Sequence, residues 1–305
     1  MSSKSKYQAV YISPHLDDVG FSCSASIIEE RKKGEVLVIT LFNKTLSVNN
    51  NLISDQQRIE EELCAAKILN YDIMLLDEAD ALIRGKKHNS IGKVFKSDIE
   101  NESDYIEHIA RQIKEKLKNT EFNKIYFPLG IGWHIDHLIA YECHKFFKDK
   151  NILFYEDNPY CLLDGASEMR LHQLQNKMPL SKKDLENSIK RIILSYHKTN
   201  MINSYSLPLR ILFKPFINSY LRGMINFHLD SLSPKKFINL KFIEKLLYLD
   251  QGLLNKKIQA SECYKSQFPI FFESRSDLLE KLKIYCQSKP EKELYERYHI
   301  LESLE

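Results

Sequence analysis

Residues 7–18 read YQAVYISPHLDD, and this stretch marks where the fold begins. The apolar, β-branched run Tyr7–Ser13 predicts a buried strand. The strand is expected to stop at Pro14, because proline has no backbone N–H to donate to a neighbouring strand. Three polar side chains follow at once and are therefore expected at the carboxyl end of this strand: His15, Asp17 and Asp18.

The first half of the chain alternates apolar runs with segments of helical periodicity. The run Val36–Phe42 (VLVITLF) is nearly all apolar, as expected of a strand buried on both faces. Further strands are predicted at Ile73–Asp77, Lys124–Leu129 and Ile152–Glu156, and helices at Val19–Lys33, Asp55–Leu69 and Asp104–Lys118. This alternation predicts an α/β fold, in which a mainly parallel sheet is flanked by helices.

The second half has a different pattern, because helical periodicity dominates over residues 161–255. Within it, residues 201–250 hold seven Lys/Arg, three Asp/Glu and eight aromatic side chains. The chain is therefore predicted to have an α/β core over 1–160, a helical insertion or cap over 161–255, and C-terminal helices over 256–305 that pack back on the core. A solvated basic helical face is favoured for 201–250, with peripheral contact to an anionic membrane surface as the alternative.

The composition limits the class of protein. The 305 residues are 43% hydrophobic and 28% charged, which is typical of a folded chain. The net charge of only +3 predicts no nucleic-acid partner. Nine glycines and nine prolines make collagen-like and glycine-rich phosphate-loop proteins poor candidates. A small-molecule or glycan substrate is the expected partner.

The six cysteines and the N-terminal residues predict a reducing environment. No two cysteines have the CxxC spacing of a zinc clip or redox pair, so free thiols are expected. The segment MSSKSKYQAV has no apolar signal core. No stretch approaches the roughly 18 uninterrupted apolar residues of a membrane span. A cytoplasmic location without a transmembrane segment is therefore expected.

A second polar segment, Gly130–His137 (GIGWHIDH), follows the predicted strand Lys124–Leu129. In a parallel sheet both polar segments lie at the same edge, where ligands bind. Two histidines and a carboxylate around a vacant position are a ligand set of catalytic zinc, and they also suit iron or another divalent ion. A hydrogen-bonded loop explains either segment alone about as well. The occurrence of both at equivalent strand ends favours a metal site.

The spacing of these residues predicts hydrolytic chemistry. His15 and Asp18 are three residues apart across a strand-to-helix turn, so they can share one ion. Of His134 and His137, one helical turn apart, one can bind while the other faces the substrate as a protonated imidazole. Asp17 is left beside the metal to take a proton from an activated water. These groups together predict metal-assisted hydrolysis of an amide or ester.

The two polar segments resemble the motifs of a known family. PHLDD at 14–18 and HIDH at 134–137 resemble the first and second motifs of the PIG-L/LmbE-like de-N-acetylases. Weaker resemblances to the same family lie at Arg58–Leu69, Asp77–Arg84, Tyr155–Tyr160 and Lys257–Gln267. The resemblance implies a Rossmann-like fold, in agreement with the alternation of strands and helices.

The resemblance also implies a role for each residue of the motifs. Zinc, with Fe²⁺ or another divalent ion as the alternative, would be held by His15, Asp18 and His137. Arg58 and Asp80 would line the sugar pocket and bind substrate.

The catalytic groups implied by the resemblance are Asp17 as the general base and His134 facing the developing oxyanion, with Asp136 orienting His134. The implied activity is a zinc-dependent de-N-acetylase that removes acetate from an N-acetylglucosamine-type amino sugar. The sugar could be linked to a nucleotide, a lipid or a natural product.

Three positions depart from the family pattern. Leu16 and Ile135 replace prolines that supply no ligand, and Gly132 stands where some members have a tyrosine, whose role cannot be transferred. Two alternative functions stay open. One is an amidase acting on a thiol conjugate or another acyl amide, and the other is a non-catalytic glycan-binding protein on the same scaffold.

Overall fold

The computed structural model describes residues 5–45, 54–85, 87–88, 94, 99–175, 181–196, 199, 240–287 and 293–302. Most of the basic aromatic stretch 201–250, up to residue 239, lies outside the described residues. The division of the chain into core, insertion and C-terminal segment stays a prediction. No helix among the described residues is long and apolar enough to cross a lipid bilayer.

A seven-stranded sheet forms the centre of the molecule, in the order β3-β2-β1-β4-β5-β7-β6. The strands are β1 (Ser5–Ser13), β2 (Val36–Thr40), β3 (Asp72–Leu75), β4 (Thr120–Pro128), β5 (Ile152–Tyr155), β6 (Phe242–Tyr248) and β7 (Tyr295–Leu301). The first five are parallel, β7 pairs antiparallel with β5, and β6 pairs antiparallel with β7. The predicted α/β class and mainly parallel sheet are confirmed.

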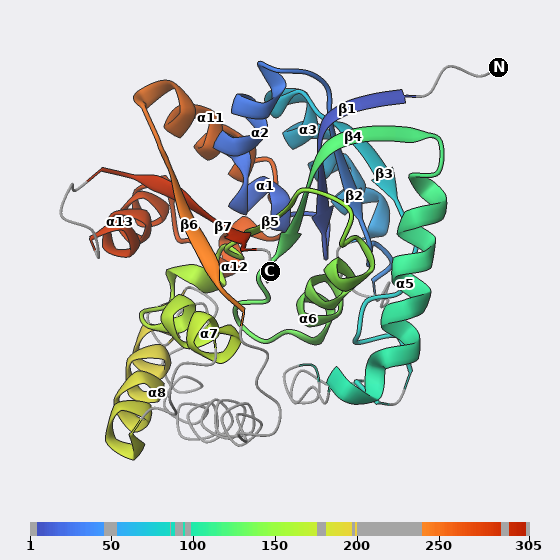
Figure 1. Ribbon diagram of the computed structural model, residues 1–305. Helices are drawn as coiled ribbons and strands as arrows, with labels where there is room; N and C mark the ends of the chain where they lie inside the picture. Colours follow the sequence, from blue (N-terminus) through green and yellow to red (C-terminus); the bar gives the residue numbers. More distant parts are fainter. Residues whose placement is uncertain are drawn as a thin grey trace.

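Helices cover both faces of this sheet (Figure 1). They include α1 (Asp18–Ser22), α2 (Ser24–Arg31), α3 (Asp55–Leu69), α5 (Ser103–Lys116), α6 (Ile135–Glu142), α7 (Ala166–Leu174), α8 (Lys182–Tyr196), α11 (Gln251–Ser261), α12 (Phe268–Phe271) and α13 (Arg275–Cys286). Alternate residues of β1 enter two separate cores: Val10 packs with α5 and α6, and Tyr11 with α2, α3 and α11. Both faces are apolar because both are covered.

The C-terminal half differs from the expectation of helices alone, because it contains strands β6 and β7. The segment 242–248 places apolar residues at 242, 243, 246 and 247, a spacing that also fits a helix. Pairing with β7 along the whole of β6, from Phe242 opposite Leu301 to Tyr248 opposite Tyr295, decides for a strand. The local sequence pattern does not decide between helix and strand here, because the pairing partner is far away in the sequence.

The predicted helix Val19–Lys33 is interrupted at Cys23, which separates α1 from α2. A buried ion pair takes the place of two helical hydrogen bonds. Lys257 Nζ donates to the carbonyls of residues 21 and 22, and the Glu296 carboxylate accepts from the N–H groups of residues 25 and 26. The Nζ and Oε1 atoms of the pair are 2.8 Å apart. The break is therefore caused by residues far away in sequence.

The strand order places the two polar segments together. The chain leaves β1 for β2 and β3 on one side and returns to β4 on the other, so the order reverses between β1 and β4. In open α/β sheets, ligands bind beyond the carboxyl ends of the strands at such a reversal. His15 follows β1 and His134 follows β4, so both lie at this point.

Two cysteines are paired, which corrects the expectation of free thiols. Cys64 of α3 and Cys263 form a disulfide across 199 residues of sequence, with a Cα–Cα distance of 5.7 Å. The packing of α11 against α3 brings them together, and sequence spacing does not indicate this. Four cysteines among the described residues stay free and buried: Cys23, Cys143, Cys161 and Cys286.

Candidate metal centre

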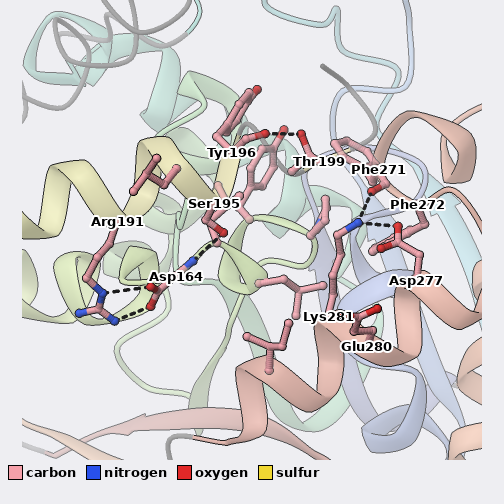
Figure 2. A pocket seen from close by; sticks show the side chains of 16 residues that line it. Asp164, Arg191, Ser195, Tyr196, Thr199, Phe271, Phe272, Asp277, Glu280 and Lys281 are labelled. Carbon is pink, nitrogen blue, oxygen red and sulfur yellow. Dashed lines mark hydrogen bonds and ion pairs between the residues drawn. The ribbon is translucent and has the colours of Figure 1, made fainter. Parts of the chain in front are cut away.

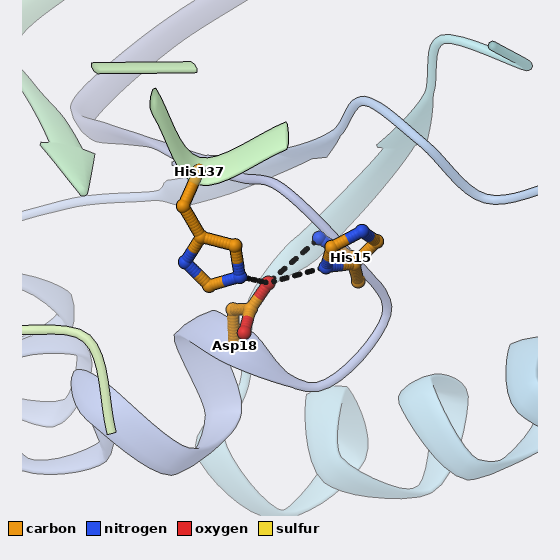
Figure 3. A group of neighbouring side chains, drawn as sticks. All are labelled: His15, Asp18 and His137. Atoms are coloured by element: carbon orange, nitrogen blue, oxygen red, sulfur yellow. Dashed lines mark hydrogen bonds and ion pairs between the residues drawn. The ribbon is translucent and has the colours of Figure 1, made fainter. Parts of the chain in front are cut away.

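Three side chains from the two polar segments converge on one point (Figure 3). His15, Asp18 and His137 each offer one ligand atom, and these atoms all lie within 4.8 Å of one another. Asp18 Oδ2 is 3.2 Å from His15 Nδ1 and 3.4 Å from His137 Nε2. All three side chains are buried. The structure thus brings together the residues that the sequence predicts as metal ligands.

Local hydrogen bonds shape the turn that follows β1. Asp18 Oδ2 accepts the backbone N–H of His15 at 2.8 Å, which closes the turn back on itself. Ser13 Oγ donates to the carbonyl of His15 at 2.6 Å and accepts the N–H of Val19 at 3.3 Å. These bonds hold the side chains of residues 15 and 18 on the same side of the turn.

The second segment reaches the centre through the start of α6. His134 is the N-cap residue, and its Nδ1 accepts the backbone N–H of Asp136 at 3.2 Å. His137 then lies in the first turn of the helix. Its Nδ1 is 2.6 Å from Asp157 Oδ1, so an Nδ1–H donated to this carboxylate leaves Nε2 as the nitrogen facing Asp18.

Asp157 itself is held by the backbone. Its Oδ2 accepts the N–H groups of Gly130 at 2.8 Å and Ile131 at 3.0 Å. The carboxylate therefore links the loop after β4 to the ring of His137. The sequence analysis assigned no role to Asp157, although it lies in the Tyr155–Tyr160 segment that resembles the family.

Residues His15, His134 and Asp136 form a second group with ligand atoms within reach of one ion. Its carboxylate is already engaged: Asp136 Oδ2 accepts the N–H of Ala81 at 2.9 Å, and Oδ1 lies 2.7 Å from Arg84 Nη1. An ion pair with arginine leaves less negative charge for a cation. The group of His15, Asp18 and His137 is therefore the better metal site.

The donor set fits a divalent cation. The neighbouring imidazoles outweigh the effect of burial and lower the pKa of Asp18 to about 2, which keeps it ionised. Burial opposes a charge on His15, yet hydrogen bonds to Asp136, Asp18 and Asp80 raise its pKa well above the ordinary value. The carboxylates around His15 thus favour positive charge at this point. Two imidazoles and one carboxylate suit zinc, iron and similar ions.

Asp17 lies beside this group and is a suitable proton acceptor. Burial raises the pKa of its carboxyl to about 6, although Arg58 opposes the rise. Arg58 Nη2 is 3.1 Å from Asp17 Oδ1. A carboxylate with a pKa near neutrality can take and return a proton at working pH.

The surroundings of His134 disfavour the protonated imidazole that the sequence analysis predicts. Burial, together with the charges of His15 and His137, lowers the pKa of His134 despite the nearby Asp136. Because Nδ1 accepts the backbone N–H of Asp136, the ring proton is on Nε2. Asp136, predicted to orient His134, does so here through its backbone, while its carboxylate contacts His15 at 3.1 Å.

The centre opens into a cavity of about 150 Å³. It is lined by His15, Asp17, Asp18, Arg58, Asp80, His134, His137, Pro159, Tyr160, Gln267 and Phe271. The predicted substrate-binding residues Arg58 and Asp80 are therefore on its wall. Asp136 is fully buried behind it. Phe271 comes from the C-terminal part of the chain, and no sequence pattern identifies it as a lining residue.

Tyr160 occupies the space beside Gly132, the position at which this chain departs from the family pattern. A Cβ on Gly132 would lie 2.5 Å from Tyr160 Cγ, and the φ of +88° also favours glycine. The Tyr160 ring packs edge-on against His137, with the centroids 5.5 Å apart. The loop after β5 thus fills the space that a side chain at 132 would need.

Comparisons with known proteins agree with this architecture. Residues 10–146 match the family described as PIG-L: GlcNAc-PI de-N-acetylase. The 2'-N-acetylparomamine deacetylase of Streptomyces fradiae is 21% identical over 199 residues, which are 60% of this chain and 69% of that protein.

Two solved structures share the fold over nearly the whole chain. The A40926 pseudoaglycone deacetylase has a TM-score of 0.61 at 16% identity, covering 98% of this chain and 99% of its own. The zinc-inhibited form of teicoplanin deacetylase has a TM-score of 0.62 at 15% identity, covering 98% and 100%. Residues 10–146 therefore form a PIG-L domain, with both histidine motifs at one edge of its sheet.

Proposed function

We propose that this protein is a metal-dependent hydrolase that removes the N-acetyl group from an N-acetylated amino sugar and releases acetate. The observation that carries the proposal is the convergence of His15, Asp18 and His137 beside Asp17 at the floor of one cavity. The family match supports the type of reaction, and the relative from Streptomyces fradiae, named for an N-acetylated natural product, supports an amino-sugar substrate.

The cation would be held by His15, Asp18 and His137. When bound, a divalent ion supplies Lewis-acid polarisation of the acetyl carbonyl and lowers the pKa of the attacking water. Zinc is proposed first and Fe²⁺ second, because two imidazoles and a carboxylate suit both.

Asp17 acts as the general base. It takes a proton from the water that attacks the acetamide carbon, and it later returns a proton to the nitrogen as the C–N bond breaks. The products are acetate and the free amine. Arg58, in contact with Asp17, favours the ionised carboxylate that begins this cycle.

His134 stabilises the oxyanion that develops on the carbonyl oxygen. Its neutral ring donates from Nε2, and the backbone N–H of Asp136 fixes this tautomer. A pre-oriented donor of this kind stabilises charge that appears only in the transition state.

Arg58 and Asp80 bind the sugar. Both line the cavity next to the reacting groups.

The direct test is hydrolysis of a substrate panel by the metal-loaded protein. N-acetyl sugars and other acyl amides are supplied in parallel, and free amine and acetate are measured. We expect the acetamido sugars to react, and Asp17→Asn to keep its metal but lose about 10²- to 10⁴-fold in kcat. Full hydrolysis by a metal-stripped sample in chelator would refute the mechanism.

The same panel separates the two alternatives. Preference for a thiol conjugate or another acyl amide would assign the same centre to an amidase. Binding of a sugar without release of amine, in a sample with stoichiometric metal, would assign a glycan-binding role.

A further inference from the structure

A second cavity of about 420 Å³ lies beside the metal centre (Figure 2). Its walls come from the loop after β5, from α8, and from the end of α12 together with α13. This volume is within the range of small-molecule binding sites, which run from about 300 to 1,000 Å³. The cavity at the metal centre, at about 150 Å³, is much smaller.

The two cavities are adjacent. They share three lining residues: Pro159, Tyr160 and Phe271. The ring of Tyr160 packs against His137 on the side of the metal centre and lies 6.3 Å from the ring of Phe271. The rings of Tyr160 and Phe271 therefore lie at the boundary between the two cavities, and a molecule that extends from the metal centre past them would enter the larger one.

The larger cavity has apolar side chains on each of its walls, and two of these side chains face solvent. Leu194 of α8 is 53% exposed and Ile284 of α13 is 51% exposed. These are two of the five large apolar side chains that are exposed among the described residues. They come from different elements and line the same cavity, so they form a shared apolar surface.

The charged groups of this cavity are mostly paired with each other. Asp164 pairs with Arg191, and Asp277 with Lys281, as Figure 2 shows. Among the described residues of the lining, Glu280 is the one charged residue outside these two pairs, so the cavity offers little charge to attract an ionic ligand. The chemistry of the cavity thus favours an uncharged apolar group.

From this adjacency and this lining, we infer that the larger cavity binds an apolar substituent attached to the sugar of the substrate, its aglycone, while the acetamido group lies at the metal centre. The inference rests on the proposed function, because it assumes that an amino sugar occupies the metal centre. It narrows the substrate class to amphipathic glycosides.

The test compares the octyl and methyl glycosides of N-acetylglucosamine as substrates, below the concentration at which the octyl compound forms micelles. We expect the octyl glycoside to have a kcat/KM at least about tenfold higher, mainly through a lower KM, because several methylene groups leave water on binding. Equal kcat/KM values would overturn the inference and leave the deacetylase proposal intact.

Variants locate the effect in the cavity. The double variant Leu194→Gln/Ile284→Gln should lose most of the octyl preference and keep its activity on the methyl glycoside. Leu63→Gln is the matched control, since Leu63 is 53% exposed on α3 and outside this cavity. An unchanged octyl preference in the double variant would contradict the assignment.

Two further measurements separate the outcomes. Octyl glucoside has no amide to cleave, and its affinity, measured by calorimetry, should be lower for the double variant than for the wild type. This expectation does not depend on whether any acetamido sugar is hydrolysed. If the double variant instead impairs only N-octanoylglucosamine, the cavity accepts the acyl chain and the aglycone assignment is wrong.

Discussion

Two buried clusters of histidine and carboxylate lie near each other in this molecule, and only one has the features of a site. At the metal centre, His15 and His137 both face a single oxygen of Asp18, and the group borders a cavity. The other cluster surrounds Glu156 at the end of β5. Its members are Glu156, Ser167, Tyr285, Arg297 and His299.

The Glu156 cluster is closed. Oε1 is 2.9 Å from His299 Nε2 and 3.0 Å from Arg297 Nε, and Oε2 accepts hydroxyls of Ser167 and Tyr285 at 2.7 Å each. Four donors satisfy the carboxylate. Although burial opposes ionisation, His299 and Arg297 lower the pKa of Glu156.

The comparison teaches that burial of charge does not by itself mark a functional site. A carboxylate surrounded by donors is a structural anchor, which here joins β5, β7, α7 and α13. A carboxylate that shares one oxygen between two imidazoles, beside a cavity, is arranged for a cation. Matched substitutions in the two clusters should therefore have different effects.

The largest effect is expected from His137→Ala, which removes one of the three ligands. The variant should lose its metal and roughly a thousandfold in kcat/KM. Elemental analysis and hydrolysis measure both. His299→Gln is the matched change in the closed cluster and should keep one ion per chain. If His137→Ala kept one metal ion per chain, the distinction between the metal centre and the closed cluster would be wrong.

The next largest effect is on stability. Glu156→Gln removes the closer and more buried of the two carboxylates that face Arg297, the other being Glu244 at 3.3 Å, so the free energy of unfolding should fall by about 3 kcal/mol. Urea unfolding measures it. Metal content should be unchanged in the folded fraction. Loss of metal without loss of stability would mean that the Glu156 cluster belongs to the centre after all.

A smaller effect is expected from Asp157→Asn. The amide no longer provides a carboxylate for His137 Nδ1–H, so metal affinity should fall about 10- to 100-fold. Competition with a chelator of known affinity measures this change. Asp72→Asn, at an exposed position of β3, is the control and should leave the affinity unaltered.

The smallest effect is a pH slope that arises from Glu62, a third buried carboxyl. Burial raises its pKa to about 7, although hydroxyls of Tyr71 and Tyr264 oppose the rise. The folded protein thus holds a proton that the unfolded chain releases above about pH 4.5. The stabilising contribution is complete below that pH and is lost as the pH rises through 7.

Thermal unfolding between pH 4.5 and 7 measures this slope. Glu62→Gln should be less sensitive to pH than the wild type, whereas Glu60→Gln, exposed on the same helix, should follow the wild type. Identical slopes in all three proteins would remove Glu62 as the cause.

The sequence determined the elements near the centre and the residues that meet there. The apolar pattern and the flanking residues Pro14 and Gly34 predict the first strand and the first helix, because these elements depend on residues that are close together in the sequence. The HxxD and HxxH spacings at His15 and His134 predict ligand pairs for the same reason. The parallel sheet, inferred from alternation, was enough to predict that the two pairs meet.

The tertiary structure alone decided what depends on contacts between distant segments. Asp157 meets His137 across the loop after β4, Lys257 and Glu296 interrupt the first helix, and β6 becomes a strand by pairing with β7. The disulfide of Cys64 and the reach of Phe271 into the cavity have the same origin. Periodicity reports the neighbours of a residue along the chain, whereas these features are set by which surfaces pack together.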